Sequence, residues 1–347
     1  MKALVLHAKE DLRYEEIATP IINSDEVLIK VRATGICGSD FPRVLGGESR
    51  YFPNILGHEF SGEIAEIGDK VTHLVSGDKV TGAPLKPCME CDDCLSGNHA
   101  QCKHYSFIGS REFGTFAEYV KMPARNVVKL PEGCSFVQGA FIEPITVALH
   151  GLFLADFKGA SSVAIVGAGT IGLLALQCAK AMGAKTITAF DISEANLEKA
   201  KKLGADYIVN TSSKDMRKQI KEITKGKGFE YVIESAGVQF TEILSLEIAG
   251  VKGNVMYIGT PHSEIKLQQN EFEFINRKEL LVRGSWMSYS NPWPGKEWTI
   301  AGDYLSTGKI NVDLLADRIV PMEEGVQAFK DIKARIVNGK VILTNER

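Results

Sequence analysis

Four cysteines, Cys88, Cys91, Cys94 and Cys102, lie within fifteen residues in the pattern C-x2-C-x2-C-x7-C. Thiols at this density either bind a metal ion or oxidise. Zinc accepts four sulfur ligands in a tetrahedron and brings no redox chemistry of its own. An iron–sulfur cluster would also accept four cysteines, and four unrelated thiols are the simplest alternative. Because the surrounding run KPCMECDDCLSGNHAQCK has too few apolar residues for a core, we predict a structural zinc ion that holds this lobe together.

A second set of possible ligands consists of Cys37 in TGICGSD, His58 in LGHEF and Glu143 in FIEPITV. A thiolate, an imidazole and a carboxylate suit zinc, and three protein ligands leave one position open for water or substrate, as catalysis requires. Each residue also has an ordinary explanation. Cys37 could be a small buried residue, His58 a hydrogen-bonded core histidine, and Glu143 a carboxylate at a helix start. Spacing alone does not join the three into one site.

The run VGAGTIG contains a glycine-rich motif, Gly167-x-Gly169-x-x-Gly172, between an apolar strand and a helix. The first glycine permits a tight turn, the second lets the backbone approach a pyrophosphate, and the third lets helix pack on strand. Asp191 ends the next strand, where its carboxylate would bind ribose hydroxyls and repel a 2′-phosphate, which favours NAD over NADP. A glycine turn that binds another ligand is the alternative. The expected cofactor-binding residues are Gly167, Gly169, Thr170, Ile171, Gly172, Asp191 and Gly259.

Secondary-structure signals divide the chain into a β-rich part and a part in which strands and helices alternate. Runs such as EVLIKVRATGIC and FSGEIAEIG predict strands before residue 150. From about residue 161, apolar strands alternate with helices, which is typical of a doubly wound parallel sheet. The final strand-like run, GKVILT, has no core of its own and is expected to rejoin the first part. We predict a mostly β catalytic domain at 1–150, a Rossmann NAD-binding domain at 151–287, and a return segment at 288–347.

Composition excludes several classes of partner. The 347 residues carry a net charge of −3, with a pI near 6.2, which gives no electrostatic basis for binding nucleic acid or an anionic membrane. The first residues lack the pattern of a secretory signal. Seven cysteines, four of them clustered as a chelate, fit a reducing compartment better than a disulfide scaffold. A cytoplasmic protein without membrane or nucleic-acid partners is expected.

Several motifs together resemble one enzyme family. GICGSD, GHEFSGEIAEIG, the four-cysteine lobe, EPITVALH and VGAGTIG occur in the order found in zinc-dependent medium-chain alcohol and polyol dehydrogenases. The resemblance covers essentially the whole chain and implies a GroES-like catalytic domain beside the Rossmann domain. It also implies that Cys37 and His58 bind the catalytic zinc, with Glu143 as the carboxylate ligand of polyol dehydrogenases.

The resemblance assigns three further catalytic residues. Glu59 matches a glutamate that can approach the metal when substrate is absent. Asp40 matches the carboxylate that orients the histidine ligand, and Ser39 matches the hydroxyl that takes the alcohol proton. One departure concerns the proton relay, because related sorbitol and threonine dehydrogenases have a histidine where this chain has Pro42.

The substrate class also follows from the resemblance. CGSDFPR, YSFIGSREFGTFAEY and GSWMSYSNPWPGKEW resemble family members that oxidise hexitol phosphates. The implied reaction is zinc- and NAD-dependent oxidation of a secondary hydroxyl, converting galactitol 1-phosphate to tagatose 6-phosphate. Sorbitol dehydrogenases are expected to have an arginine where this chain has Ser288, which argues against plain sorbitol. Another polyol or polyol phosphate is the alternative, and a non-catalytic zinc- or NAD-binding regulator is a more distant one.

A phosphorylated substrate needs a cation, because a dianion must be bound by a protein of net negative charge. Arginine suits this task because its planar fork bonds two phosphate oxygens at once. Arg43, in CGSDFPR, and Arg111, in IGSREFG, are the two main candidates, and Lys296, in PWPGKEW, is a third. Tyr289 is expected to contact the substrate as well. The resemblance further implies a homodimer, with a tetramer possible, joined through the sheet edge near residues 280–300.

Overall fold

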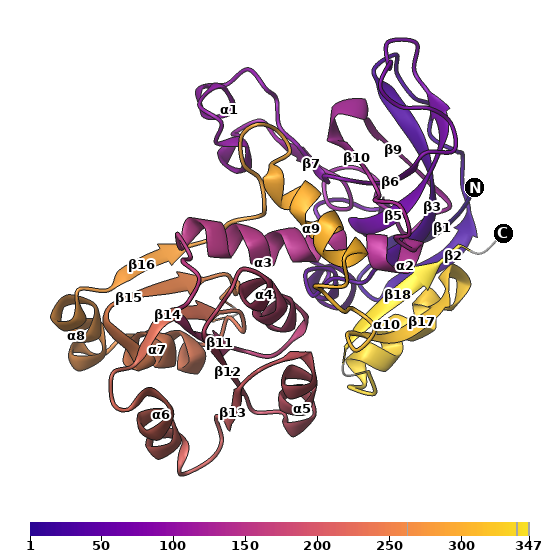
Figure 1. Cartoon of the computed structure of the whole chain (residues 1–347). Helices are drawn as coiled ribbons and strands as arrows, with labels where there is room; N and C mark the ends of the chain where they lie inside the picture. The colour runs from indigo at the N-terminus through magenta and orange to yellow at the C-terminus, as the bar shows by residue number, and fades with distance from the viewer. Residues whose placement is uncertain (262, 338, 346–347) are drawn as a thin grey trace. The chain divides into compact units, whose positions relative to one another are not determined.

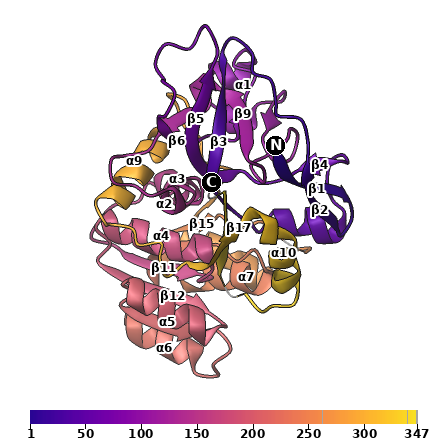
Figure 2. The same cartoon turned by 90° about the vertical axis from the view of Figure 1, so that its right-hand side faces the viewer.

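The computed structural model describes residues 1–261, 263–337 and 339–345. The chain forms two compact units (Figure 1). The first comprises Met1–Glu143, Tyr289–Ser306 and Val312–Arg347, and the second comprises Pro144–Ser288 and Thr307–Asn311. Within the first unit, the yellow C-terminal strands lie beside the indigo N-terminal ones, as both views show (Figures 1 and 2).

The second unit is built on a parallel sheet of six strands in the order β13-β12-β11-β14-β15-β16. The chain order reverses between β11 and β14, and crevices at such switch points bind nucleotides in folds of this kind. The four residues Val163–Val166 of β11 are fully buried. The strands are β11 (Ser162–Val166), β12 (Thr186–Asp191), β13 (Tyr207–Asn210), β14 (Phe229–Glu234), β15 (Ala249–Tyr257) and β16 (Leu281–Gly284).

Helices cover both faces of this sheet, with α4 and α5 on one side and α6, α7 and α8 on the other (Figure 1). The helix α5 begins and ends as its sequence predicts. The Ser193 hydroxyl accepts the backbone N–H of Asn196 at its start, and Gly204 adopts a left-handed conformation at its end. The helices are α3 (Ile142–Leu154), α4 (Thr170–Ala181), α5 (Glu194–Leu203), α6 (Met216–Thr224), α7 (Gln239–Ile248) and α8 (Gln269–Lys278).

The first unit is mostly β. Its largest sheet runs β10-β6-β5-β3-β18-β17, and β9 also pairs with β3. In this sheet β18, from the end of the chain, is antiparallel to β3. The strands of this sheet are β3 (Glu26–Gly35), β5 (Glu59–Ile67), β6 (Lys79–Gly82), β9 (Tyr119–Pro123), β10 (Val127–Lys129), β17 (Ala316–Pro321) and β18 (Lys340–Thr344).

Smaller elements complete the first unit. A second sheet has the order β2-β1-β4, and β7 pairs with β8 at the base of the four-cysteine lobe. These strands are β1 (Lys2–Ala8), β2 (Asp11–Glu16), β4 (Asn54–Ile55), β7 (Leu85–Lys86) and β8 (Ser106–Phe107), and the helices are α1 (Asp92–Leu95), α2 (Phe136–Gly139), α9 (Lys296–Ser306) and α10 (Gly325–Lys333).

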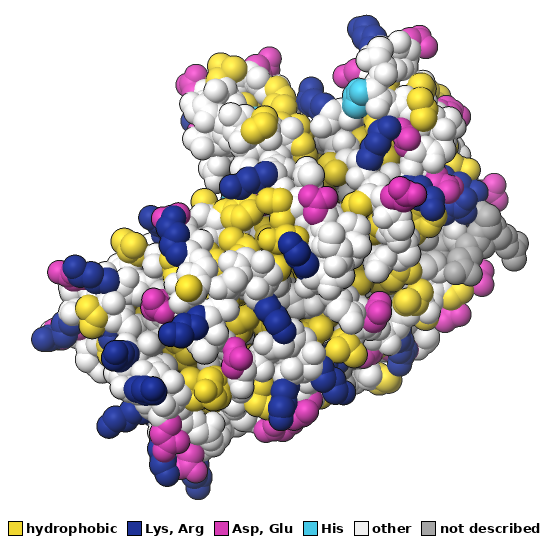
Figure 3. Space-filling view, in the orientation of Figure 1, with side chains coloured by type: hydrophobic (Ala, Val, Ile, Leu, Met, Phe, Trp, Pro, Cys, Tyr) yellow, Lys and Arg dark blue, Asp and Glu magenta, His cyan; other side chains and the backbone are white. Residues whose placement is uncertain are grey.

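Positive and negative side chains are interspersed over the face drawn in Figure 3. Among the helices of the described residues, none is long and apolar enough to cross a membrane.

Candidate active site and metal centres

The four clustered cysteines converge as one set of metal ligands. Their Sγ atoms all lie within 4.8 Å of one another. The Cys88–Cys94 and Cys91–Cys102 pairs are 3.9 Å apart, and the Cys88–Cys102 pair is 3.5 Å apart. A tetrahedron of sulfurs around zinc has edges of about 3.8 Å, whereas a disulfide requires about 2 Å. The spacing therefore fits one zinc ion held by four thiolates.

Backbone N–H groups favour the charged form of part of this set. Cys91 donates its N–H to Sγ of Cys88 at 3.4 Å, and Cys88 donates its own to Sγ of Cys102 at 3.3 Å. The N–H groups of Glu90 and Cys91 lower the pKa of Cys88 to about 7, while burial raises the pKa of Cys94 to about 12. The more exposed thiol is thus ready to bind metal near neutral pH, and the buried one needs the cation to release its proton.

The lobe also depends on aromatic residues from the segment after β16. The rings of His99 and Trp293 meet edge to face at 5.1 Å, and Trp293 stacks on Tyr289 at 5.0 Å. The buried Tyr289 hydroxyl accepts the backbone N–H of Leu85 at 3.2 Å. Tyr289, predicted as a substrate contact, therefore has a visible part in supporting the lobe, and its contact with substrate stays a prediction.

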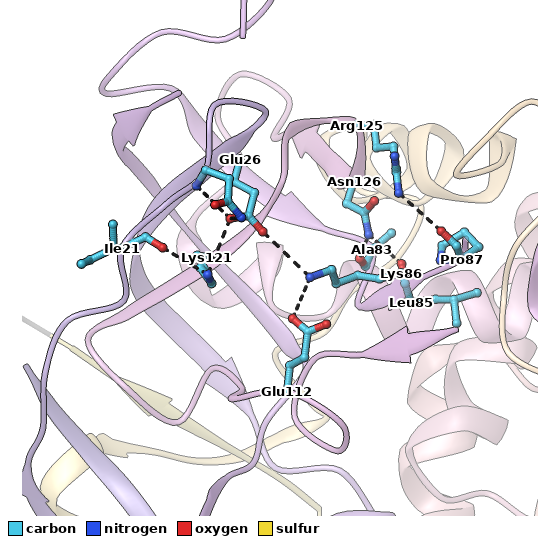
Figure 4. A network of polar contacts seen from close by, with 11 residues as sticks. Ile21, Glu26, Ala83, Leu85, Lys86, Pro87, Glu112, Lys121, Arg125 and Asn126 are labelled. Carbon is cyan, nitrogen blue, oxygen red and sulfur yellow. Dashed lines mark hydrogen bonds and ion pairs between the residues drawn. The ribbon is translucent and has the colours of Figure 1, made fainter. Parts of the chain in front are cut away.

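Polar contacts fix the base of the lobe to the rest of the first unit (Figure 4). The buried Asn126 amide donates to the carbonyl oxygens of Ala83 and Leu85 at 2.7 and 2.6 Å. Next along the chain, Lys86 forms an ion pair with Glu112 at 2.7 Å. These contacts hold β7, the strand that enters the lobe, and join it to Glu112, which lies after β8.

Sheet pairing brings together the second set of ligands. Gly35, at the end of β3, pairs with Glu59, at the start of β5. Cys37 follows β3 and His58 precedes β5, so the antiparallel register places the two side by side. Ligand atoms of Cys37, His58 and Glu59 all lie within 4.8 Å of one another. The predicted pair of ligands is therefore brought together, and the Glu59 carboxylate completes the group.

Glu143 lies close to this cluster but outside the 4.8 Å group. It occupies the first turn of α3 and is buried. Burial raises the pKa of Glu143 to about 7, and the neighbouring His58 acts in the opposite direction. The carboxylate is thus near enough to His58 to interact electrostatically with it, and its role as third ligand stays a prediction.

Lys340 is a site residue that sequence reasoning missed. Its ammonium forms a buried ion pair with the Glu59 carboxylate and also donates to the carbonyl of Ile36 at 3.3 Å. Burial opposes the charge, yet the neighbouring Glu59 and Cys37 raise the pKa of Lys340 on balance. A lysine in the otherwise apolar run GKVILT was the available signal. Only the pairing of β18 with β3 shows that this lysine reaches the metal site.

Asp40 and Ser39 lie beside the cluster. The fully buried Asp40 carboxylate accepts the backbone N–H of Cys37 at 3.0 Å, which fixes the turn carrying that ligand. Burial raises the pKa of Asp40, and the nearby His58 lowers it. Arg43 donates to the hydroxyl of Ser39 at 3.1 Å and lies 3.6 Å from Asp40. The expected Asp40–His58 hydrogen bond is not formed among the described residues, and Asp40 Oδ1 and His58 Nδ1 remain buried without one.

The composition of this site fits a divalent cation. Its acidic groups outnumber its cationic ones, and buried charges of one sign are costly unless a counter-charge is present. A soft thiolate with an imidazole and carboxylates is a donor set that zinc accepts. The acidic members are Cys37, Asp40, Glu59 and Glu143, and the cation buried among them is Lys340.

The glycine-rich loop after β11 has the geometry expected of a phosphate-binding turn. Gly167 has φ +93°, which only glycine adopts easily. A Cβ on Gly172 would lie 1.8 Å from the carbonyl oxygen of Gly167, whereas one on Gly169 would meet nothing within 4 Å. The open space at Gly169 lies at the N-terminus of α4, where N–H groups attract anions.

Asp191 has a second function that its sequence position did not reveal. One carboxylate oxygen accepts the backbone N–H of Ala168 at 2.7 Å, and the other accepts that of Ser193 at 2.8 Å. The side chain therefore anchors the glycine loop and still has lone pairs for a ribose. At the end of β15, a Cβ on Gly259 would lie 2.5 Å from the nitrogen of Gly237, so this position also requires glycine. Thr170 and Ile171 are half-buried in the first turn of α4.

Comparisons with known proteins agree with this geometry. Residues 23–132 match the model of the alcohol dehydrogenase GroES-like domain, and residues 170–300 match that of the zinc-binding dehydrogenase. The chain is 43% identical to galactitol 1-phosphate 5-dehydrogenase of Escherichia coli K12, over 99% of both chains. It is 36% identical to sorbitol dehydrogenase of Bacillus subtilis 168, over 87% of this chain and 86% of that one.

A solved structure shows the same architecture. The crystal structure of galactitol-1-phosphate dehydrogenase from Escherichia coli superposes with a TM-score of 0.96 at 43% identity, covering 99% of this chain and 100% of that chain. The predicted fold class, a Rossmann sheet with a GroES-like domain and a four-cysteine lobe, is confirmed. The chain therefore belongs to the zinc-binding alcohol dehydrogenase family, and it is an oxidoreductase whose cofactors are zinc and NAD.

Proposed function

We propose that this protein oxidises a secondary hydroxyl of a hexitol phosphate with NAD, converting galactitol 1-phosphate to tagatose 6-phosphate. The chemistry is carried by one observation, the convergence of the ligand atoms of Cys37, His58 and Glu59, in which His58 and Glu59 are buried and Cys37 is half-buried. The substrate is supported by the identity to the Escherichia coli galactitol 1-phosphate 5-dehydrogenase over nearly the full length of both chains.

The residues of the site divide the work. Cys37, His58 and Glu143 would hold the catalytic zinc, and the four lobe cysteines the structural one. When bound, zinc supplies a Lewis acid that lowers the pKa of a hydroxyl, and NAD supplies a hydride acceptor. Ser39 would accept the hydroxyl proton, and Asp40 holds the turn that carries Cys37. We assign this chemistry to residues 1–150 with 288–347, and cofactor binding to residues 151–287.

The cofactor preference is proposed to rest on Asp191 and on the residue after it. Ile192 follows Asp191 and is 72% exposed, so a 2′-phosphate would meet a carboxylate and an apolar group. A ribose diol would instead gain hydrogen bonds from the carboxylate that already anchors the loop. This arrangement supports NAD over NADP.

We also propose that the protein is a homodimer joined along β16. This strand lies at the edge of the parallel sheet and is exposed along its whole length. Beside it, a mostly apolar cavity of about 450 Å³ reaches Val282 and the half-exposed Trp286. Exposed, apolar edge strands readily pair with another chain. A cytoplasmic location is proposed as well, because the seven cysteines are free thiols.

The proposed reaction is tested by a screen for NADH production from zinc-loaded protein. Galactitol 1-phosphate, galactitol, sorbitol and sorbitol 6-phosphate are compared at equal concentration. We expect galactitol 1-phosphate to be oxidised most efficiently of the four. The related sorbitol dehydrogenase makes sorbitol the competing substrate, although Ser288 is buried and accepts a hydrogen bond from Thr146 at 2.8 Å. Preference for sorbitol would replace the proposal, and no oxidation at all would favour a non-catalytic protein.

A further inference from the structure

We propose that Arg111 binds the phosphate group of the substrate, and that Arg43 serves Ser39 and Asp40 instead. The sequence offers both arginines for the phosphate and cannot choose between them, whereas the contacts of the two guanidinium groups differ. This inference rests on the proposed function, because it concerns a phosphorylated polyol bound at the same site.

Arg111 lies in a turn directly beside the metal site. Its backbone N–H donates to the carbonyl oxygen of Phe107 at 2.8 Å. The ring of Phe107 in turn packs on the ring of His58, with centroids 5.6 Å apart at an interplanar angle of 67°. Phe107 is half-buried while His58 is almost fully buried. The turn therefore forms part of the wall next to the histidine ligand.

The guanidinium of Arg111 is held in place, but most of its N–H donors form no hydrogen bond among the described residues. It lies 3.8 Å from the ring centroid of Tyr105, and Nη1 donates to the carbonyl oxygen of the same residue at 2.9 Å. Arginine has five N–H donors, and within the described part of the chain the others have no partner. A stacked, oriented fork with donors to spare is suited to bidentate phosphate binding.

The charge of Arg111 is also uncompensated. The next residue in the chain, Glu112, forms an ion pair with Lys86 at 2.7 Å instead of with Arg111. Lys86 also lies 3.9 Å from Glu26 (Figure 4). Arg111 itself forms no ion pair with any carboxylate of the described ranges. An anion bound at Arg111 would therefore interact with a positive charge that no carboxylate of the described residues neutralises.

Arg43 has the opposite properties. Its Nη1 donates to the carbonyl oxygen and to the hydroxyl of Ser39 at 3.0 and 3.1 Å, and it lies 3.6 Å from the buried Asp40 carboxylate. That carboxylate offsets the charge that a phosphate would need. Arg43 follows Pro42, and its guanidinium holds the serine hydroxyl in place. Its loss should therefore affect every substrate.

The substrate itself requires a phosphate contact at some distance from the reacting carbon. In an extended hexitol phosphate, four carbon–carbon bonds and two phosphoester bonds separate the reacting carbon from phosphorus, or about 7 Å from the bond lengths involved. A substrate whose hydroxyl is bound beside His58 thus carries its phosphate well beyond that ring. The turn that carries Arg111 begins at Phe107, whose ring packs against His58, so Arg111 lies four residues along the chain from this contact.

The test compares Arg111→Ala, Arg43→Ala and Arg50→Ala, with Arg50 as an exposed control of the same residue type. Steady-state constants are measured for galactitol 1-phosphate and for galactitol, on protein whose zinc content equals that of the wild type. For Arg111→Ala we expect KM for the phosphorylated substrate to rise roughly ten- to a hundredfold, with constants for galactitol unchanged. Arg43→Ala should lower kcat for both substrates, and Arg50→Ala should change neither.

Two further measurements separate phosphate binding from support of the turn. Arg111→Lys keeps the charge but loses the fork, so its KM for the phosphorylated substrate should lie between the wild-type and alanine values. Guanidinium ion added to Arg111→Ala should partly restore activity toward galactitol 1-phosphate and leave galactitol oxidation unaltered. If Arg111→Ala folds poorly, the lysine variant provides the same comparison of substrates.

Failure of this inference differs from failure of the proposed function. If the wild type oxidises galactitol 1-phosphate efficiently but Arg111→Ala loses activity equally toward both substrates, Arg111 supports structure and the assignment is wrong. A phosphate-selective loss in Arg43→Ala would overturn it as well. If the wild type oxidises no polyol phosphate, the proposed function itself is wrong.

Discussion

Lys340 and Glu59 form an ion pair in which the two side chains are only 4% and 3% exposed. They come from opposite ends of the chain and meet because β18 and β5 flank β3. Gly35 of β3 leaves room for both, since a Cβ there would lie 2.6 Å from the Glu59 carboxylate and 2.6 Å from the Lys340 side chain. The pair fixes a carboxylate next to the metal ligands while balancing its charge.

Removing the lysine alone should strongly destabilise the protein. Lys340→Met leaves the Glu59 carboxylate buried without a counter-charge, which typically costs about 3–5 kcal/mol. Lys340→Met combined with Glu59→Gln removes both charges and should recover most of that loss. Urea unfolding of the metal-free proteins measures both effects, because a zinc ion beside Glu59 would itself supply a counter-charge. A double variant no more stable than the single one would show that the pairing of charge is not what matters.

Metal-free protein should lose stability as pH rises through the range in which Glu143 ionises. The pKa of Glu143 is raised to about 7 from an ordinary 4.5. The folded state therefore binds the proton more tightly than the unfolded state, so stability falls as pH rises from about 4.5 to about 7. We expect a loss of roughly 1–3 kcal/mol across this interval. Glu143→Gln should reduce the slope to the part that the raised pKa of Asp40 contributes, and added zinc should reduce it as well. A wild type and glutamine variant with the same pH dependence would contradict this origin.

Replacing one lobe cysteine should remove one of two zinc ions and lower stability. Cys88→Ser leaves three thiolates in a lobe that has few apolar residues. The change should lower stability, because structural zinc contributes directly to folding. The zinc content measured by elemental analysis should fall from two ions per chain to one, and the midpoint of thermal unfolding should be lower. As a matched control, Cys134→Ser changes a buried cysteine outside both metal clusters and should retain both ions. Iron in place of zinc in wild-type protein would contradict the lobe assignment.

Asp191→Ala should weaken NAD binding and reduce the ratio of the affinity for NAD to the affinity for NADP. The change removes the carboxylate that would bind the ribose diol and repel a 2′-phosphate. Because the same side chain anchors the N–H of Ala168, some affinity for both cofactors should also be lost through a looser glycine loop. Asp191→Asn, which can keep the Ala168 contact through its carbonyl oxygen, separates the two effects. Equal turnover of both cofactors by the wild type would exclude this role for Asp191.

The sequence was sufficient to predict the features that depend on a local pattern of residues. The glycine spacing of VGAGTIG, the Ser193 cap and the Gly204 stop are local features, and each lies where it was expected. The four cysteines form a site within fifteen residues, so their convergence needed no knowledge of the fold.

Contacts between distant segments could not be inferred in this way. Lys340 reaches Glu59 only through the pairing of β18 with β3, and no spacing along the chain indicates it. The different partners of Arg43 and Arg111 likewise depend on side-chain geometry, because both are single arginines in polar runs. The support that Tyr289 gives to the lobe depends on stacking with Trp293, which motif comparison does not show.

The central claim, that the protein oxidises a phosphorylated hexitol, is tested most directly by comparing kcat/KM for galactitol 1-phosphate and galactitol. Zinc-loaded enzyme is assayed with NAD, and the product is identified. We expect kcat/KM to be at least roughly tenfold higher for the phosphorylated substrate, as one charge-assisted contact to phosphate would give, with one NADH formed per tagatose 6-phosphate. Equal or lower efficiency with galactitol 1-phosphate, or a product other than the 2-keto sugar phosphate, would contradict the claim.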